Sequence, residues 1–307
     1  MWEKGMLVLA MPALAALAFL TGVMVRDSSR FTAVTYRIVS PKLRKGCRAV
    51  MLSDLHNKEY GEHNGRLVRA IEEQKPDFIL IAGDMVTANK EKTQVRVPLE
   101  LLRQLTERYP VYYGMGNHEY RMKIFPEDYG DKFSRYAEEL RSCGVRLLEN
   151  GRICLPEYGL EVCGLEAEWR FYKKFRRSPM EEEYMDGLLG KSRTDCMEVL
   201  LAHNPDYFKQ YAAWGADLVL AGHVHGGMVR LPGLGGVISP SVHFFPKYDG
   251  GLFEEYGSRM ILGRGLGAHT IPVRLFNPGE LVVVDLVAGS GSHKAGNSSP
   301  CPRKIKT

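Results

Sequence analysis

Residues 48–56 read RAVMLSDLH, a short apolar run that ends in an Asp-x-His pair. Residues 77–84 (DFILIAGD) and residues 111–119 (VYYGMGNHE) follow the same plan, because each begins with an apolar run and ends in glycine and polar side chains. Short apolar runs bounded by glycine and polar residues predict buried strands. The three predicted strands therefore end in the candidate functional residues Asp54, Asp84 and Asn117.

The segments between these strands have the pattern of helices. Residues 64–74, 97–108 and 132–142 repeat apolar side chains at helical spacing. Strands that alternate with helices through short loops predict an α/β fold with a parallel sheet. Ligands of such sheets gather beyond the carboxyl ends of the strands. We therefore expect the polar strand ends to share one site.

The second half of the chain supplies more polar strand ends. Residues 153–165 have the pattern of a hairpin, and residues 198–203 (EVLLAH) are an apolar run that leads into His203. Residues 218–225 (LVLAGHVH) lead in the same way into a pair of histidines, His223 and His225. Two further strands are expected late in the chain.

Seven strand-end side chains form the candidate metal site: Asp54, His56, Asp84, Asn117, His203, His223 and His225. Carboxylate oxygens mixed with imidazole nitrogens suit Mn, Fe, Zn or Co, whereas an all-oxygen site suits Mg or Ca. Asp54 and His56 lie two residues apart on a chain expected to be extended, so both should face one side, and the same holds for His223 and His225. If two ions share the site, Asp84 is the natural bridge because a carboxylate has two oxygens.

Two divalent ions about 3.5–4 Å apart can clamp a phosphoryl group and supply hydroxide at neutral pH. His118 directly follows Asn117 and is expected to reach the edge of the site without binding metal. It would act as a general acid or stabilise transition-state charge. Glu119 or another carboxylate is expected to orient its ring. Each residue alone has an ordinary structural explanation, but the ordered set at strand ends predicts a metal-dependent phosphoesterase.

These motifs resemble those of the calcineurin-like metallophosphoesterase superfamily. The matching residues are Asp54-Leu55-His56, Gly83-Asp84, Gly116-Asn117-His118-Glu119, His203 and Gly222-His223-Val224-His225. The resemblance implies a four-layer sandwich of two β-sheets flanked by helices. It also implies one metal on Asp54, His56, Asp84 and His225, a second on Asp84, Asn117, His203 and His223, and His118 as the catalytic histidine.

A closer resemblance is to a membrane-associated branch similar to UDP-2,3-diacylglucosamine pyrophosphatases. It is carried by the amino-terminal apolar segment, by Gly226-Gly227, and by residues 263–267 (GRGLG) ahead of residues 272–274 (PVR). Thr87 stands where many relatives carry an acidic residue, and Met228 stands where glutamine is common. The resemblance therefore implies an active enzyme with an open choice of substrate.

Residues 6–25 (MLVLAMPALAALAFLTGVMV) carry no charge. Twenty helical residues span about 30 Å, the thickness of a bilayer core. A signal peptide would have a shorter apolar run and small residues at its cleavage site, whereas valine and methionine precede Arg26. We therefore expect a single-pass membrane anchor. Basic residues are denser after this run than before it, so the positive-inside rule favours a cytoplasmic catalytic domain.

The expected organisation is an anchor over residues 1–30, a metallophosphoesterase domain over residues 31–288, and a disordered tail over residues 289–307 that is rich in Gly, Ser, Pro and Lys. Residues 166–192 lie between motifs and include WRFYKKFRR, so we interpret them as either a substrate cap or a solvated surface segment.

The composition fits a phosphate-bearing partner or an anionic membrane. The net charge is +5 and the pI is about 8.8, but the basic residues are spread along the chain and form no nucleic-acid-binding motif. The six cysteines form no Cys-x-x-Cys pair. The sequence thus predicts hydrolysis of a phosphate ester or pyrophosphate of a lipid-linked substrate by metal-activated hydroxide. The alternatives are a soluble phosphodiester hydrolase and a metal-binding scaffold without turnover.

Overall fold

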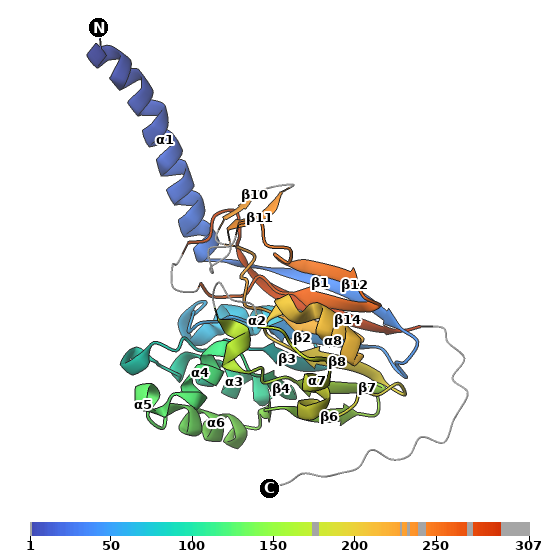
Figure 1. The fold of residues 1–307 in the computed structure, drawn as a ribbon. Helices are drawn as coiled ribbons and strands as arrows, with labels where there is room; N and C mark the ends of the chain where they lie inside the picture. The colour runs from blue at the N-terminus through green and yellow to red at the C-terminus, as the bar shows by residue number, and fades with distance from the viewer. Residues whose placement is uncertain are drawn as a thin grey trace.

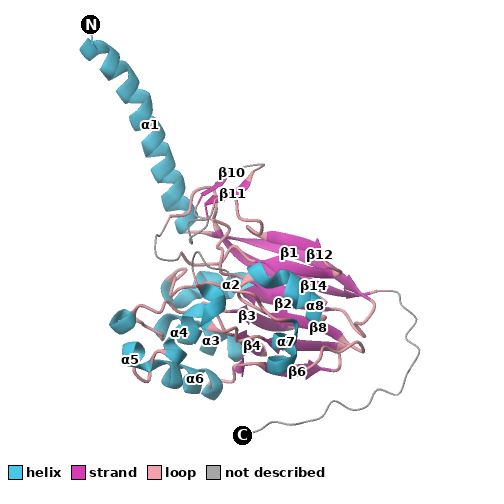
Figure 2. Cartoon of the chain, viewed as in Figure 1, coloured by secondary structure: helices cyan, strands magenta, loops and turns pink. Residues whose placement is uncertain are grey.

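Two six-stranded sheets stacked face to face form the body of the chain (Figures 1 and 2). The computed structural model describes residues 2–173, 178–227, 229–231, 234–238, 244–268 and 273–289. A long amino-terminal helix, α1 (Trp2–Ser28), extends away from this body (Figure 1). The α/β fold of two sheets flanked by helices confirms the predicted architecture.

The first sheet has the order β1-β14-β2-β3-β4-β5. Its strands are β1 (Phe31–Ser40), β14 (Gly279–Ala288), β2 (Cys47–Leu52), β3 (Phe78–Ala82), β4 (Val111–Gly114) and β5 (Arg146–Leu148). All neighbours are parallel except β14 and β2. The carboxyl ends of β2, β3 and β4 therefore meet at one edge, as the sequence predicted.

The second sheet has the order β12-β13-β9-β8-β7-β6. Its strands are β12 (Gly251–Glu255), β13 (Ser258–Leu262), β9 (Leu218–Ala221), β8 (Met197–Leu201), β7 (Leu160–Gly164) and β6 (Gly151–Leu155). The four central strands are parallel, and the two outer strands join them as antiparallel hairpins. A separate small hairpin consists of β10 (Val229–Leu231) and β11 (Gly235–Ile238).

Helices cover the outer faces of both sheets. The longer helices are α2 (Gly65–Gln74), α3 (Arg96–Thr106), α4 (Asn117–Ile124), α6 (Lys132–Ser142), α7 (Glu182–Leu189) and α8 (Phe208–Trp214). Short turns complete the set: α5 (Pro126–Tyr129), η1 (Glu62–Asn64), η2 (Lys90–Lys92), η3 (Trp169–Tyr172) and η4 (Pro205–Tyr207). The sequence predicted α2, α3 and α6, but it missed α4, α7 and α8, which are short and have weak helical patterns.

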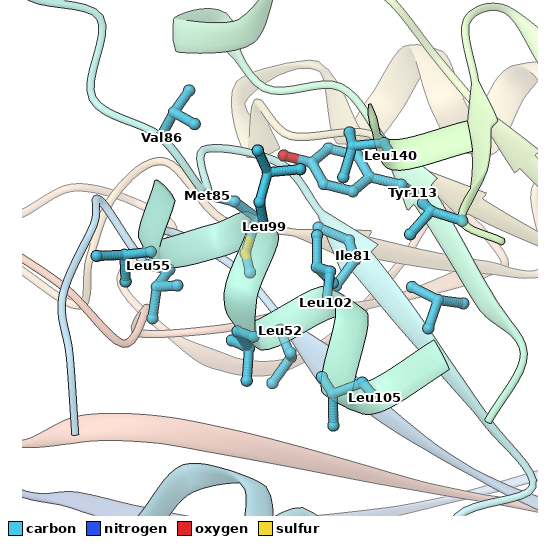
Figure 3. Close-up of a cluster of buried hydrophobic side chains, with 14 of the residues drawn as sticks. Leu52, Leu55, Ile81, Met85, Val86, Leu99, Leu102, Leu105, Tyr113 and Leu140 are labelled. Carbon is cyan, nitrogen blue, oxygen red and sulfur yellow. The ribbon is translucent and has the colours of Figure 1, made fainter. Parts of the chain in front are cut away.

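Three buried apolar clusters hold these layers together. One lies between the sheets, where Met51 and Leu80 of the first sheet meet Val199 and Leu220 of the second. Another joins the first sheet to α2, α3 and α6, and Figure 3 shows Leu52, Ile81 and Tyr113 of the strands beside Leu99, Leu102 and Leu105 of α3. The third joins the second sheet to α7 and α8. Each fully buried Leu or Val side chain contributes about 1.5–3 kcal/mol of transfer free energy.

The segment after α1 is a strand that the sequence analysis did not identify. β1 pairs with β14 along its whole length. The partners, such as Phe31 and Gly279, are nearly the whole domain apart in sequence, so no local pattern could identify the pairing. The predicted tail lies, from residue 290 onward, outside the described residues, and the predicted domain limits stay predictions.

Candidate metal centre

Five strand ends deliver the predicted metal residues to one edge of the molecule. Asp54 and His56 follow β2, Asp84 follows β3, and Asn117 begins α4 after β4. His203 follows β8 of the second sheet, and His223 and His225 follow β9. Nδ1 of His203 lies 2.6 Å from the carbonyl oxygen of Ala82, the last residue of β3. This contact ties the two sheets together at the site.

The backbone is left-handed at five of these residues, so the expectation of an extended chain at Asp54 and His56, and at His223 and His225, was wrong. The φ angles are 49° at Asp54, 47° at His56, 54° at Asp84, 74° at His223 and 55° at His225. Such angles are uncommon in residues other than glycine and cost free energy, so they persist where surrounding structure enforces them. The loop after β2 donates two backbone hydrogen bonds to the loop after β3. The Asp54 amide donates to the Gly83 carbonyl oxygen at 3.0 Å, and the His56 amide donates to the Asp84 carbonyl oxygen at 3.2 Å.

The side chains converge in overlapping groups. Asp54, His56 and His225 form the first, with Asp54 Oδ1 3.3 Å from His225 Nε2 and 3.2 Å between the Nε2 atoms of the two histidines. Asp84, His203 and His223 form the second, with Asp84 Oδ2 2.9 Å from His203 Nε2. Within each group the candidate ligand atoms lie within 4.8 Å of one another. Asp84 also lies in a third group with His56 and His118.

Three of the histidines have the orientation that metal ligands adopt. Nδ1 of His56 lies 3.2 Å from Thr87 Oγ1, and Nδ1 of His225 lies 3.3 Å from the Gly267 carbonyl oxygen. His203 contacts Ala82 in the same way. A proton on Nδ1 that is donated to such an acceptor leaves the Nε2 lone pair to face the site. Thr87 thus has a defined contact with a candidate ligand.

Two buried polar atoms of the predicted ligands test whether metal fits. Asp54 Oδ2 and Asn117 Oδ1 have no hydrogen-bond partner within the described part of the chain. Leaving such groups buried and unsatisfied costs about 1–3 kcal/mol each. Both belong to side chains that follow strands of the first sheet, and bound divalent cations would satisfy them. The donor set therefore fits the implied metals.

The buried charges perturb one another strongly. Burial raises the pKa of Asp54 to about 6, and the nearby Asp84 carboxylate adds to this while His203 opposes it. Burial also acts on Asp84, but the histidines around it hold its pKa well below the usual value. The pKa of His203 rises to about 10, because the carboxylates of Asp84 and Asp54 outweigh its burial. Cations would compensate this concentration of carboxylate charge.

His118 lies at the edge of the site. Its Nε2 is 4.0 Å from Asp84 Oδ2, and its Nδ1 accepts a hydrogen bond of 2.8 Å from the Ala88 amide. Burial lowers the pKa of its ring. In the neutral ring this amide contact leaves the proton on Nε2, the atom directed at the site.

Glu119, one of the carboxylates expected to orient His118, makes its described contacts with other groups. Its carboxylate accepts hydrogen bonds from the amides of Asp84 at 2.9 Å, Met85 at 2.8 Å and Gly116 at 3.0 Å, and from the Tyr113 hydroxyl at 2.7 Å. It therefore holds the Asp84 loop against the start of α4. The sequence could not distinguish these roles, because both need a buried carboxylate at this position.

Close backbone approach explains several glycines of the motifs. A Cβ atom on Gly116 would overlap the Asp84 carboxylate, and one on Gly267 would overlap the Leu55 carbonyl group. A Cβ on Gly265 would lie 2.7 Å from that of Asp54. The buried Arg274 donates to the carbonyl oxygens of Gly265 and Gly267, which fixes the loop beneath the site. Pro272, part of the same sequence cue, lies outside the described residues.

Tyr172 is a site residue that the sequence did not single out. Its ring lies 5.6 Å from that of His223 and 6.4 Å from that of His203, measured between centroids. It belongs to η3, within the 166–192 segment for which a substrate cap was one interpretation. Residues 174–177 of that segment lie outside the described residues. The aromatic side chains of WRFY were the available signal.

Two other acidic groups have a different explanation. Glu161, Cys163 and Glu198 cluster in the second sheet, but the Arg152 guanidinium pairs with both glutamates and already supplies the positive charge. Glu59, His63 and Glu100 cluster on the surface, where the side chain of His63 is 61% exposed. Neither group adjoins the strand ends described above.

A two-sheet α/β sandwich with carboxylate and histidine groups at its strand ends defines a class of metal-dependent hydrolases. The profile of the family described as calcineurin-like phosphoesterase matches residues 47–227, well over half of the chain. The chain therefore belongs to the calcineurin-like phosphoesterase family, as its motifs predicted. Members of this family use a dinuclear metal centre.

Relatives in several organisms support this assignment. An uncharacterized metallophosphoesterase of Helicobacter pylori strain J99 is 28% identical over 254 residues, covering 80% of this chain and 61% of that protein. The phosphodiesterase YaeI of Escherichia coli is 29% identical over 218 residues, covering 70% of this chain and 72% of that protein. A transmembrane protein with metallophosphoesterase domain from Danio rerio is 28% identical over 254 residues, covering 80% and 54%. The matched region thus spans less than two thirds of two of these relatives.

Helix α1 contains a segment that meets the length and composition of a membrane span. Met11–Ser28 has a mean hydropathy of 1.2, and only 6% of this segment is buried within the chain. A helix that exposes a continuous apolar surface needs an apolar environment.

Proposed function

We propose that the chain is a dinuclear-metal phosphoesterase that hydrolyses a phosphate ester or pyrophosphate of a lipid-linked substrate. One ion would lie on Asp54, His56, Asp84 and His225, and the other on Asp84, Asn117, His203 and His223. The observation that carries this proposal is the overlap of the acid–histidine groups at Asp84. Mn, Fe, Zn and Co all suit this mixture of oxygen and nitrogen donors.

Asp84 would help to hold both ions. Its Oδ1 accepts a hydrogen bond of 2.8 Å from the His118 amide, whereas Oδ2 faces the histidine side chains. Glu119 supports the position of Asp84, because its carboxylate accepts a hydrogen bond from the Asp84 amide.

When bound, the two ions neutralise the phosphoryl oxygens and make water nucleophilic at neutral pH. The side chains do the remaining work. His118, with its proton on Nε2, would donate to a phosphoryl or leaving-group oxygen. The ring of Tyr172 would cover the His223 side of the site and restrict how a substrate enters, in agreement with a cap formed by residues 166–192.

Helix α1 would anchor the chain in a membrane as a single span. The density of basic residues after the helix favours a catalytic domain on the cytoplasmic side. The transmembrane relative from Danio rerio supports a link between this kind of domain and a membrane. An anchored site meets lipid phosphates at high local concentration, which is why a lipid-linked substrate is preferred.

A soluble phosphodiester is the second candidate substrate, and YaeI, named a phosphodiesterase, favours it. A metal-binding scaffold without turnover is the third possibility. Assays of the full chain in detergent distinguish these three possible functions. The substrates are bis(p-nitrophenyl) phosphate and a lipid pyrophosphate, and each is assayed with Mn and after chelation. Mn-dependent turnover that is lost in His225→Gln and kept in the surface variant His63→Asn supports the enzyme. Bound metal with no hydrolysis of either substrate supports the scaffold.

A further inference from the structure

Helix α1 leaves the body at the same edge as the metal centre, and the sheet register requires this. β1 begins directly after α1, and its first residue, Phe31, is paired with Gly279 at the start of β14. β14 runs antiparallel to β2, with Val282 opposite Met51, so its start lies beside the end of β2. Asp54 is two residues beyond that end. The helix and the site therefore share one edge of the first sheet.

Exposed apolar side chains gather at this edge. They are Leu231, Leu234, Phe244, Phe245 and Phe276, and we call them the apolar rim; their exposed fractions run from 37% to 68%. Isolated β-bridges connect the segments that carry these side chains. Ile238 of β11 pairs with Phe244, and Val229 of β10 pairs with Leu275. Figure 1 shows the β10–β11 hairpin beside the end of α1. Large apolar groups clustered in this way mark an interaction surface.

Hydrogen bonds fix the apolar rim to both the helix and the metal centre. The amide of Asn277, next to Phe276, donates to Oδ2 of the buried Asp27 in the last turns of α1, at 3.1 Å. The Asn277 side chain donates to the carbonyl oxygens of His225 at 2.7 Å and Gly227 at 2.6 Å. The end of α1, the apolar rim and the histidine loop are thus one connected unit.

Two of the rim phenylalanines have a costly backbone conformation. The φ angle is 48° at Phe245 and 54° at Phe276, a region that bulky side chains rarely adopt. Strain of this kind costs on the order of 1–3 kcal/mol. Here it holds aromatic side chains at the surface, where the isolated domain gains nothing from them.

We propose that the apolar rim inserts into the interface of the bilayer that α1 crosses, so that the mouth of the metal centre faces the lipid headgroups. The inference rests on the proposed role of α1 as a membrane anchor. A lipid surface is the occupant that continuity with α1 favours, because both apolar surfaces leave the body at one edge. Aromatic and aliphatic side chains at such a depth lie about 5–10 Å into the headgroup boundary. The orientation would bring the phosphate of a lipid to the site without extracting the lipid.

The test places a tryptophan on the apolar rim of the full chain, in vesicles of phosphatidylcholine and phosphatidylglycerol. Phe244→Trp is compared with Tyr256→Trp, since Tyr256 is 52% exposed, has a φ of 57° and lies before β13, at the edge opposite the metal centre. Lipids brominated in the upper acyl chain should quench roughly half or more of the fluorescence added by Phe244→Trp and little of that added by Tyr256→Trp. Equal, weak quenching would show that the apolar rim lies in water or against a protein, and would overturn the proposal.

A second measurement joins the apolar rim to substrate choice. The double variant Phe244→Ser, Phe245→Ser should lose roughly tenfold of turnover on a vesicle-borne phosphodiester and none on soluble bis(p-nitrophenyl) phosphate. An equal effect on both substrates would contradict membrane docking. The quenching measurement does not depend on activity. If the chain is inactive but the fluorescence of Phe244→Trp is quenched, the proposed function is refuted and the membrane-docking proposal still stands.

Discussion

Nε2 of His203 lies 2.9 Å from Oδ2 of Asp84, although the two residues come from different sheets. The candidate metal centre therefore lies across the seam between the sheets, and its assembly depends on their packing. Asp84 follows β3, in the first sheet, and His203 follows β8, in the second. Substitutions that shift one sheet end by a fraction of an ångström are expected to separate the two halves of the site.

Removing the His118 imidazole should slow hydrolysis without removing metal. His118→Ala should lower kcat by about 10²–10⁴-fold, the usual contribution of a positioned proton donor. Its Nε2 lies 4.0 Å from Asp84 and is not among the proposed ligands, so metal content should not change. Initial rates and metal analysis check this, with His63→Asn as the control for an exposed histidine. Undiminished turnover would mean that another group supplies the proton.

A methyl group on Gly116 should disrupt the centre. A Cβ atom there would overlap the Asp84 carboxylate, so Gly116→Ala should displace Asp84 and reduce turnover by about 100-fold or more. Gly187→Ala is the matched control, because Gly187 lies in α7 with nothing within 4 Å of the added Cβ. That variant should keep full activity and gain about 0.5–1 kcal/mol of stability. Normal activity in Gly116→Ala would show that the loop is more plastic than its packing indicates.

The buried Glu198 of the second sheet should make stability depend on pH. Burial raises the pKa of Glu198 to about 7 from its ordinary 4.5. Between these values the folded chain holds the proton more tightly than the unfolded chain, so the unfolding free energy should fall as pH rises from about 4.5 to about 7. The expected change is on the order of 2 kcal/mol. Urea unfolding across this range checks it.

Glu198→Gln supplies the control for that pH dependence, since an amide cannot titrate. The variant should lose the dependence in this window, whereas the exposed Glu138→Gln should keep it. If Glu198→Gln and the unmodified chain follow the same pH profile, another group is responsible.

The sequence pointed to the candidate metal residues because each lies just after an apolar run that has the pattern of a strand. It could not reveal the left-handed backbone at Asp54 and His225, because that conformation arises from hydrogen bonds between loops far apart in sequence. Glu119 was recognised as a buried carboxylate near the site, but its partners depend on the packing of the Asp84 loop against α4.

Pairing between distant segments was also beyond the sequence. β1 and β14 are separated by nearly the whole domain, and only their register shows that α1 leaves the body beside the metal centre. The residues of the apolar rim are scattered over the β10–β11 hairpin and two other segments and carry no periodic pattern. Their grouping arises from the fold alone.

The proposed dinuclear centre depends above all on Asp84 joining two ions, and metal analysis tests this most directly. The full chain, purified with Mn and freed of loose metal, should hold about two ions, and Asp84→Asn and Asp84→Ala should hold no more than about one and lose hydrolysis. The asparagine variant preserves the shape of the side chain, so a folding defect in the alanine variant would not obscure the result. Two retained ions with undiminished turnover in Asp84→Asn would contradict the bridged dinuclear centre.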